Sequence, residues 1–276
     1  MVIIKFWGGL GNQMFQYALH LSFLQKGINS KLDKTFYQSD TVHNGFELER
    51  IFNIKPDYCS STEKILIKPI AKIGYKLFDY PYNEKKWGYG NYNKRVANLK
   101  FGYLKGYWQT EKYFKQIENE IRDKYKFPAL EDEQNMVMLK NIKETNSVSV
   151  HIRRGDYLLN NRDWAMDINY YKKAISFIHQ KVPKVFFYIF SDDINWAKEN
   201  IKEKNVEFIS WNKNENSYRD IQLMSNCKHN IIANSSFSWW GAWLNSNENK
   251  IVIAPDNWAG MEGTRDVLPK DWIKIR

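Results

Sequence analysis

The sequence has few cysteines and no long hydrophobic run. Its 276 residues include only Cys59 and Cys227, which excludes a disulfide framework and a paired-cysteine zinc site. The five histidines show no metal-ligand spacing, so no metal cofactor is expected. No apolar stretch approaches the roughly 20 residues that cross a bilayer. These features exclude a small disulfide-rich module and a chain that crosses the membrane.

The N-terminal segment lacks the features of a signal peptide. No basic residue precedes the short apolar run in residues 1–9, and two glycines end that run. We therefore expect a β-strand at 2–7 and a cytoplasmic protein.

Positive charge and aromatic residues are abundant. The formal net charge is +10, which favours polyanionic partners such as nucleic acid, anionic lipid or phosphorylated small molecules. The basic residues are spread along the chain and no nucleic-acid motif is present, so nucleic acid is not an expected partner. The eleven tryptophans are either large core side chains or flat surfaces for stacking on sugars.

The second half of the chain alternates between strand-like and helix-like segments. Such alternation predicts βαβ units and a parallel sheet covered on both faces, with ligands bound beyond the carboxyl ends of the strands. The expected strands are 147–152, 185–190, 206–210, 230–233 and 251–254, and the expected helices are 169–181, 194–202, 218–226 and 239–245.

The first half is less regular. Its opening strand leads into a glycine turn, Gly8–Gln13, and a helix over 13–26. The turn does not match the GxGxxG dinucleotide pattern and is a weak signal alone. Residues 83–107 suit loops, 113–127 suit a helix, and 131–146 lead into the second domain. We expect domains at 1–145 and 146–276.

The segment His151–Asp156 (HIRRGD) stands where a buried strand ends. Adjacent arginines in an extended chain point to opposite sides, so one should face a ligand site while a carboxylate such as Asp156 holds the other. The guanidinium fork suits phosphate oxygens. The alternative is a surface arginine pair in a loop.

A second candidate is the segment Asn234–Leu244 (NSSFSWWGAWL). A strand ends before it, Ser235 and Ser236 form the turn, and a helix begins. Such a helix start offers backbone N–H groups and a positive dipole end to an anion. An ordinary serine N-cap explains the same residues equally well.

Two further segments carry open alternatives. Ser191–Asp193 (SDD) is either a metal-binding carboxylate pair or the N-cap of a helix, and the helical pattern that follows favours the cap. Lysines recur every fourth residue over 64–78, with isoleucines and leucine between them. This stretch is either a basic amphipathic element on an anionic membrane surface or a helix that packs its isoleucines on the core. Because Pro69 is tolerated only near a first turn, a regular helix is expected to start there.

These segments together resemble the alpha-1,2-fucosyltransferases of glycosyltransferase family 11. The opening Gly8–Ala18 is similar to the first signature of that family, and His151–Tyr157 matches its arginine motif. Phe190–Asp193 and Asn234–Trp243 complete the set, in the expected order along most of the chain.

The resemblance implies a GT-B architecture, in which two Rossmann-like domains face each other across a cleft. It implies inverting, metal-independent transfer of L-fucose from GDP-fucose to a galactosyl hydroxyl of a glycan such as a lipopolysaccharide O-antigen or a capsule. Catalytic roles would then fall to Arg153 and Asn12. The donor-binding residues that it implies or leaves as candidates are Gly11, His151, Arg154, Asp156, Asp220, Ser235, Ser236 and Phe237.

Other points stay open at this stage. Gln13 and Asp33 are acceptor-side candidates, and the general base is Asp33, Glu47, Asp156 or another group. Asp220 either accepts N–H groups of guanine or is a solvent-facing helix residue paired with Arg219 or a lysine. Alternatives to the function are another fucosyl linkage, another GDP-sugar donor, and a non-catalytic binder of nucleotide sugars or nucleic acid. The protein is expected in the cytoplasm, with peripheral contact at the inner face of an anionic membrane as an option.

Overall fold

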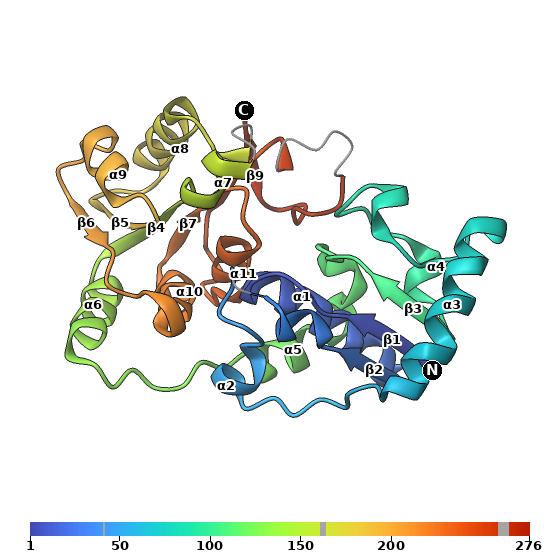
Figure 1. Cartoon of the computed structure of the whole chain (residues 1–276). Helices are drawn as coiled ribbons and strands as arrows, with labels where there is room; N and C mark the ends of the chain where they lie inside the picture. The colour runs from blue at the N-terminus through green and yellow to red at the C-terminus, as the bar shows by residue number, and fades with distance from the viewer. Residues whose placement is uncertain (41, 161–163, 259–264) are drawn as a thin grey trace. The chain divides into compact units, whose positions relative to one another are not determined.

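The computed structural model describes residues 1–40, 42–160, 164–258 and 265–276, and it divides into two units (Figure 1). Unit 1 comprises Met1–Pro128 and Gly263–Pro269, and unit 2 comprises Ala129–Glu262 and Lys270–Arg276. Each unit has its own parallel sheet. The expected domain limits of 1–145 and 146–276 stay a prediction.

Unit 1 contains a three-stranded parallel sheet in the order β2-β1-β3. Lys5 at the end of β1 lies in register with Asp33 of β2 on one side and Lys105 of β3 on the other. The elements of unit 1 are β1 (Val2–Lys5), α1 (Leu10–Gln25), β2 (Ser30–Asp33), α2 (Leu48–Phe52), α3 (Ser61–Phe78), α4 (Lys94–Ala97), β3 (Gly102–Lys105) and α5 (Glu118–Lys124).

Helix α3 differs from the sequence-based expectation. It begins at Ser61 with a complete capping box between Ser60 and Glu63, and Pro69 lies inside it. The expectation that a regular helix starts at Pro69 is therefore wrong, because the capping box fixes an earlier start. The core-facing residues are Ile67 and Ala71, which pack with residues of β1 and β3. The other isoleucines of the helix are exposed, so the expectation that they pack on the core is also wrong.

Unit 2 contains a six-stranded parallel sheet in the order β6-β5-β4-β7-β8-β9. The chain runs outward from β4 to β6 on one side, then crosses to β7 and runs outward to β9 on the other. The elements of unit 2 are α6 (Glu133–Glu144), β4 (Asn146–Ile152), α7 (Gly155–Asn160), α8 (Ile168–Lys181), β5 (Val185–Ser191), α9 (Ile194–Asn200), β6 (Val206–Ile209), α10 (Tyr218–Asn226), β7 (His229–Ile231), α11 (Ser236–Leu244), β8 (Val252–Pro255) and β9 (Ile273–Ile275).

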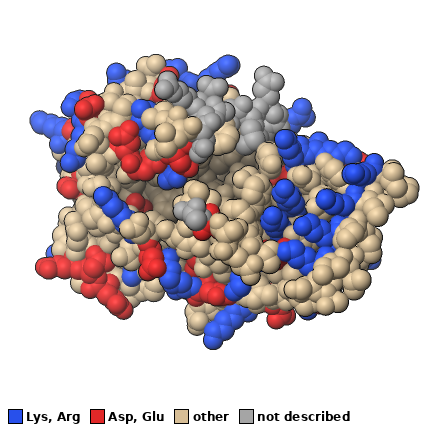
Figure 2. All heavy atoms as spheres, in the orientation of Figure 1, with Lys and Arg blue, Asp and Glu red and all other residues tan. Residues whose placement is uncertain are grey.

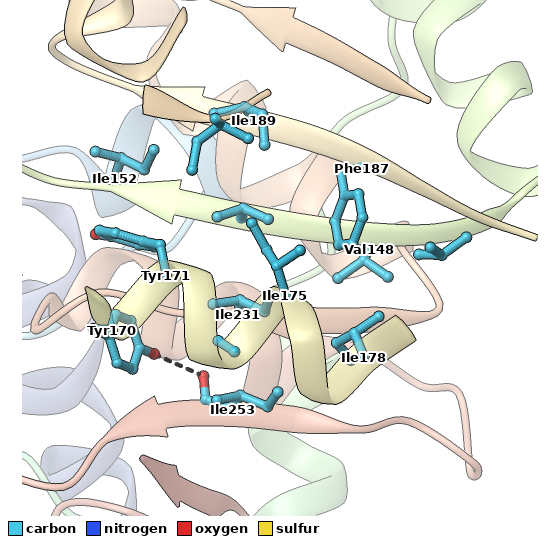
Figure 3. Close-up of a cluster of buried hydrophobic side chains, with 14 of the residues drawn as sticks. Val148, Ile152, Tyr170, Tyr171, Ile175, Ile178, Phe187, Ile189, Ile231 and Ile253 are labelled. Carbon is cyan, nitrogen blue, oxygen red and sulfur yellow. Dashed lines mark hydrogen bonds between the residues drawn. The ribbon is translucent and has the colours of Figure 1, made fainter. Parts of the chain in front are cut away.

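The apolar core of unit 2 lies between α8 and the sheet (Figure 3). Val148 of β4 and Ile175 of α8 belong to this cluster and are almost completely buried. The hydroxyl of Tyr170 donates to the carbonyl of Ile232 at 2.6 Å and to that of Ile253 at 3.3 Å. These bonds fix the start of α8 against β8 and against the residue that follows β7.

The face of β4 opposite the apolar cluster carries polar side chains. Side chains alternate along a strand, so Ser147, Ser149 and His151 of β4 face away from the apolar cluster. The amide of Asn230 on β7 donates to the Ser149 hydroxyl at 2.7 Å and to the Met224 carbonyl of α10 at 2.9 Å. This face therefore positions α10 and α11 through hydrogen bonds as well as packing.

The expected α/β class and the parallel sheet of the second half are confirmed. Two α/β units, each built on a parallel sheet, are also the parts that the implied GT-B architecture requires. Helix α1 starts at Leu10 rather than at residue 13, so all of the glycine turn after Gly9 is already helical. The expected helix over 113–127 begins as two 3₁₀ turns, and only Glu118–Lys124 forms an α-helix, α5. Within the part of the chain that the structure describes, no helix is long and apolar enough to cross a membrane.

Candidate functional site

The arginine-containing segment and the serine-containing segment lie next to each other at the centre of the unit 2 sheet. Strands β4 and β7 are parallel neighbours, and the strand order reverses between them. His151–Asp156 covers the carboxyl end of β4, and Asn234–Ser236 follows the end of β7. Ligands of open parallel sheets bind at such a reversal, beyond the carboxyl ends of the strands. The topology therefore marks this edge as the candidate site.

Two carboxylates hold Arg153. Its Nε lies 2.8 Å from Oδ1 of Asp156 and 3.2 Å from Oδ2 of Asp192, which follows β5. Burial opposes the charge of Arg153, but Asp192 and Asp156 raise its pKa above the usual value. The guanidinium is therefore charged and fixed in orientation before any ligand binds.

Arg154 contacts a different element. Its Nε lies 3.2 Å from Asp193, and its guanidinium stacks 4.0 Å from the ring centre of Trp196 on α9. The two arginines thus diverge, as expected for neighbours in extended chain. The expectation that a carboxylate holds only one of them is wrong, because each has an acidic partner.

The two aspartates after β5 have separate structural roles. Asp193 is the N-cap of α9 and accepts from the backbone N–H of Trp196 at 3.2 Å, which confirms the cap interpretation of the SDD segment. Asp192 accepts from the backbone N–H groups of Arg154 and Gly155 at 2.8 and 3.2 Å. This link from β5 to the β4 turn was not predicted from the sequence. Three or more metal-ligating side chains do not gather anywhere among the residues with described positions.

The turn after β7 presents the start of α11. Ser235 is its N-cap and accepts from the Phe237 N–H at 3.3 Å, so the serine-cap interpretation is confirmed. Ser236 and Phe237 are half-buried at the first turn of this nine-residue helix. The same turn still carries the positive end of the helix dipole, so the cap and an anion site are compatible.

His151 and Asn234 each carry a buried polar atom without a partner. Nδ1 of His151 and Oδ1 of Asn234 make no hydrogen bond with any residue that the structure describes. Burial and the charge of Arg153 lower the pKa of His151 to about 3, so the ring is neutral. Its ring centre lies 5.7 Å from that of Phe237. Buried unsatisfied polar groups are rare in folded proteins, so these two atoms mark this edge as a candidate binding site.

Tyr157 connects the turn after β4 to the turn after β7. It was not identified as a site residue from the sequence. Its hydroxyl donates to the carbonyl of Asn234 at 2.7 Å, and burial raises its pKa to about 12. The ring also lies 5.8 Å below the guanidinium of Arg153. The position directly after the RRGD sequence was the only available signal.

Asp220 lies in the first turn of α10 and is not a solvent-facing partner of Arg219. Its Oδ1 accepts from Nδ2 of Asn212 at 2.8 Å, whereas Arg219 donates to Gln222 and to the carbonyl of Ala129. Burial raises the pKa of Asp220 to about 7, opposed by the hydrogen bond from Asn212. A buried carboxyl group with so shifted a pKa is a candidate for a functional site.

Asn212 is held in turn by Asn135 of α6. Their side-chain amides exchange hydrogen bonds of 2.8 and 3.1 Å, and Trp211 donates to Oδ1 of Asn135 at 3.0 Å. This network orients the donor that faces Asp220 and was not visible in the sequence.

In unit 1, the glycine turn places Asn12 beside Gln109. Gly8 adopts φ +83°, and a Cβ at this position would lie 2.5 Å from Nδ2 of Asn12. Oδ1 of Asn12 accepts from Nε2 of Gln109 at 2.8 Å. Gly11 lies in the first turn of α1 and is buried. Glycine is therefore required at residue 8 by both the backbone conformation and the space.

The acceptor-side candidates are both engaged within unit 1. The amide of Gln13 donates to the carbonyls of Gly8 and Gly45 and accepts from the N–H of Glu47. Asp33 is buried, yet hydrogen bonds from Thr35, Tyr103 and Lys64 lower its pKa to about 2. Both side chains brace the loops that follow β1 and β2.

The general-base candidates differ in pKa and in their partners. Burial raises its pKa, although Arg50 opposes the shift from 3.1 Å. Asp33 has a depressed pKa, and Asp156 is paired with Arg153.

Comparisons with known proteins show which family the chain belongs to. The family model "Glycosyl transferase family 11" matches residues 1–276. The chain is 36% identical to an alpha-1,2-colitosyltransferase of Escherichia coli over 100% of this chain and 99% of that protein. It is 32% identical to the O-antigen biosynthesis glycosyltransferase WbnK of Escherichia coli, over 97% of this chain and 98% of that one. A galactoside 2-alpha-L-fucosyltransferase of Caenorhabditis elegans is 25% identical over 100% of this chain and 79% of that protein. Among solved structures, the fucosyltransferase NodZ from Bradyrhizobium aligns at a TM-score of 0.48 with 12% identity, over 87% of this chain and 91% of that one.

Proposed function

The chain belongs to glycosyltransferase family 11, and we propose that it is an inverting alpha-1,2-fucosyltransferase that uses GDP-fucose as donor. The acceptor in this proposal is the 2-hydroxyl of a galactosyl residue in a glycan such as an O-antigen or a capsule. The observation that carries the proposal is the reversal point of the unit 2 sheet. There, the charged Arg153, the start of α11 and the unpartnered Nδ1 of His151 gather at one edge.

The donor diphosphate binds to Arg153 and to the first turn of α11. Ser235, Ser236 and the Phe237 N–H supply neutral donors, and the helix dipole supplies partial positive charge. Arg154 and Asp156 position the other groups of this site. Asp156 holds the guanidinium of Arg153, and Arg154 attaches the turn after β4 to α9. In this proposal, guanine binds near His151 and Asp220. Nδ1 of His151 has no protein partner, and the Asp220 carboxylate is the group proposed to accept the N–H groups of the guanine edge.

The reaction exchanges one bond to the fucosyl carbon for another. The acceptor oxygen attacks C1 of fucose from the side opposite GDP, the C1–O bond to the β-phosphate breaks, and the acceptor proton passes to a base. Positive charge develops on the sugar and negative charge on the departing phosphate. Arg153 and the α11 amides stabilise the phosphate charge. Asn12 is proposed to lie near the reacting centre, with Gln109 fixing its orientation.

The choice of base follows from pKa. A base should have a pKa near the working pH. Glu47, whose pKa is raised, fits this requirement better than Asp33, whose pKa is about 2. Glu47 is therefore the first of the three candidates to test, although its carboxylate is buried and pairs with Arg50.

The test is GDP release from GDP-fucose with and without a lactose-type acceptor, followed by linkage analysis of the product. The proposal requires acceptor-dependent release and a new alpha-linked fucose on O2 of galactose. A fucosyl product with another linkage would refute the alpha-1,2 assignment but retain the donor. No release with any galactosyl acceptor would refute the function as stated.

Metal independence is part of the proposal. Asp193 caps α9 and Asp192 holds the turn after β4, so the aspartates that resemble a metal motif already have protein partners. Turnover should therefore persist in excess EDTA. Loss of turnover on chelation, with recovery on adding Mn²⁺ or Mg²⁺, would show that these carboxylates bind a metal.

A second donor is favoured by one specific observation. The relative at 36% identity is named for colitose, a sugar that differs from fucose in lacking the 3-hydroxyl. The two donors share GDP chemistry, so the nucleotide site described above does not separate them. Measuring kcat/KM for both nucleotide sugars with one acceptor distinguishes the two donors. If kcat/KM is higher for the colitosyl donor than for the fucosyl donor, colitose replaces fucose in the proposal.

A further inference from the structure

Helix α3 of unit 1 has three distinct faces. Ile67 and Ala71 pack on the sheet. Lys68, Lys72 and Lys76 follow one another at every fourth position and form a basic face.

The third face is an exposed apolar stripe. Leu66, Ile70, Ile73 and Leu77 follow the spacing i, i+4, i+7, i+11, which places them along one side of the helix. Their residues are 61, 55, 57 and 68% exposed. Phe78 extends the apolar surface at the C-terminal end and is 76% exposed. A contiguous exposed apolar surface of this kind indicates an interaction site, whereas a single exposed apolar residue does not.

The basic face extends onto the end of the unit 1 sheet. Lys5 and Lys105 are register neighbours on β1 and β3. Burial lowers the pKa of Lys5, and the nearby charges of Lys105 and Lys68 lower it further, while Asp33 opposes them. None of Lys68, Lys72 and Lys76 forms an ion pair with the residues that the structure describes.

Figure 2 shows how charged and uncharged side chains are distributed on this surface. Lys and Arg side chains gather over the region of α3, α4 and β3, and uncharged side chains lie beside them along α3. An open groove at the C-terminal end of α3 continues this surface. Phe78 lines it together with Lys94, Arg95 and Lys100.

We propose that α3 docks on an anionic lipid surface, with its apolar stripe inserted among the lipids and its lysines at the headgroups. An interfacial helix buries its apolar face about 5–10 Å into the boundary between headgroups and acyl chains, and anionic lipids attract its basic residues. The α3 surface has both components side by side. The proposal is independent of the proposed function, because it uses no residue of the candidate site.

Charge favours a lipid surface over a second copy of the chain. Two copies that met through the apolar stripe would bring their unpaired lysine rows toward each other, at a cost in repulsion. An anionic surface would instead neutralise the lysines. The net charge of +10 acts in the same direction.

The test is co-sedimentation of the full chain with vesicles of phosphatidylglycerol and phosphatidylcholine at low and high salt. We expect binding to the anionic vesicles that weakens with salt. Lys68→Glu/Lys72→Glu/Lys76→Glu should reduce the partition coefficient at least ten-fold. Ile70→Gln/Ile73→Gln/Leu77→Gln should reduce it similarly, since glutamine keeps the helix but removes apolar surface.

A matched control makes the same charge change elsewhere. Lys172, Lys181 and Lys204 are exposed residues of unit 2, and changing all three to Glu should lower binding far less than the α3 reversal. Circular dichroism melting checks that every variant is folded.

Three results would overturn the proposal. They are no binding at low salt, equal binding to phosphatidylcholine, and equal loss in the α3 and control triple variants. Self-association that the glutamine variant abolishes, without vesicle binding, would assign the stripe to a second copy instead.

Discussion

A carboxylate from the end of β5, Asp192, lies 3.2 Å from Nε of Arg153 at the end of β4. The pair joins neighbouring strands at the edge where the candidate donor site lies. Asp156 contacts the same Nε from 2.8 Å, so the guanidinium has two anionic partners and a defined direction.

The first prediction concerns the geometry of Arg153. Arg153→Lys keeps the positive charge and loses the planar fork. Because removal of one charge-stabilising donor costs about 2.7–4 kcal/mol in the transition state, kcat/KM should fall at least ~100-fold. Arg122→Lys is the control, since Arg122 pairs with Glu118 on the surface of unit 1. Near-normal turnover by Arg153→Lys would remove Arg153 from the mechanism.

The second prediction treats Asp192 as a positioning residue. Asp192→Ala leaves the N–H groups of Arg154 and Gly155 without their acceptor, which should lower the free energy of unfolding by about 1–3 kcal/mol. It should also lower kcat more than Asp193→Ala, which removes the α9 cap and costs about 0.5–2 kcal/mol of stability. Thermal melts and steady-state kinetics separate the two effects. Equal kcat in the two variants would limit Asp192 to a structural role.

The third prediction is a pH dependence through Asp220. Its pKa rises from 3.8 to about 7 on folding, so the folded protein holds the proton more tightly than the unfolded chain. The corresponding stability is fully present below about pH 4 and is lost as the pH rises through about 7. GDP binding should follow the opposite trend, because only the ionised carboxylate accepts two N–H groups of guanine.

Calorimetry of GDP binding between pH 5.5 and 8.5 tests this prediction. Asp220→Asn should weaken binding at pH 8 by at least about ten-fold, because a charged hydrogen bond contributes about 1.5–3 kcal/mol. It should also flatten the pH dependence relative to the unchanged protein, and that comparison cancels the titration of the GDP phosphates. An unchanged affinity and pH profile would exclude Asp220 from the guanine site.

The fourth prediction concerns the turn before α1. Gly8→Ala adds a Cβ at φ +83° and 2.5 Å from Nδ2 of Asn12, so the turn must shift. We expect a loss of at least about 1 kcal/mol of stability and a larger proportional loss of kcat. Gly27→Ala is the matched control, because Gly27 has φ +71° but no atom within 4 Å of the added carbon. Equal effects on kcat would mean that backbone strain alone, and not the position of Asn12, explains the loss.

Much of unit 2 was predictable because its segments have clear periodicity and clear ends. Helix α10 spans Tyr218–Asn226, as expected, since its amphipathic pattern lies between two polar loops. Strands β2 and β3 of unit 1 were missed, because four-residue strands carry too short a pattern. The start of α3 was misplaced by attention to Pro69, although the capping-box sequence at Ser60 and Glu63 was visible.

The candidate site was predictable only in its segments. Motif positions placed Arg153 and Ser235 at strand ends, which the structure confirms. The partners that position them come from other strands and loops, as in the Asp192 contact to Arg153 and the Gln109 contact to Asn12. Such pairings depend on strand order and loop path, and local sequence pattern does not encode either.

The buried ion pair between Asp33 and Lys64 has a consequence for acid tolerance. Lys64 belongs to α3, and its Nζ lies 2.9 Å from the fully buried Asp33 carboxylate of β2. Because the pKa of Asp33 is about 2, its stabilising contribution is complete above its unfolded value of about 4 and is lost only as the pH falls through about 2. The ion pair that joins α3 to the sheet is therefore expected to persist at mildly acidic pH. Helix α3, anchored in this way, should keep its exposed face in the same position on unit 1 as the pH falls.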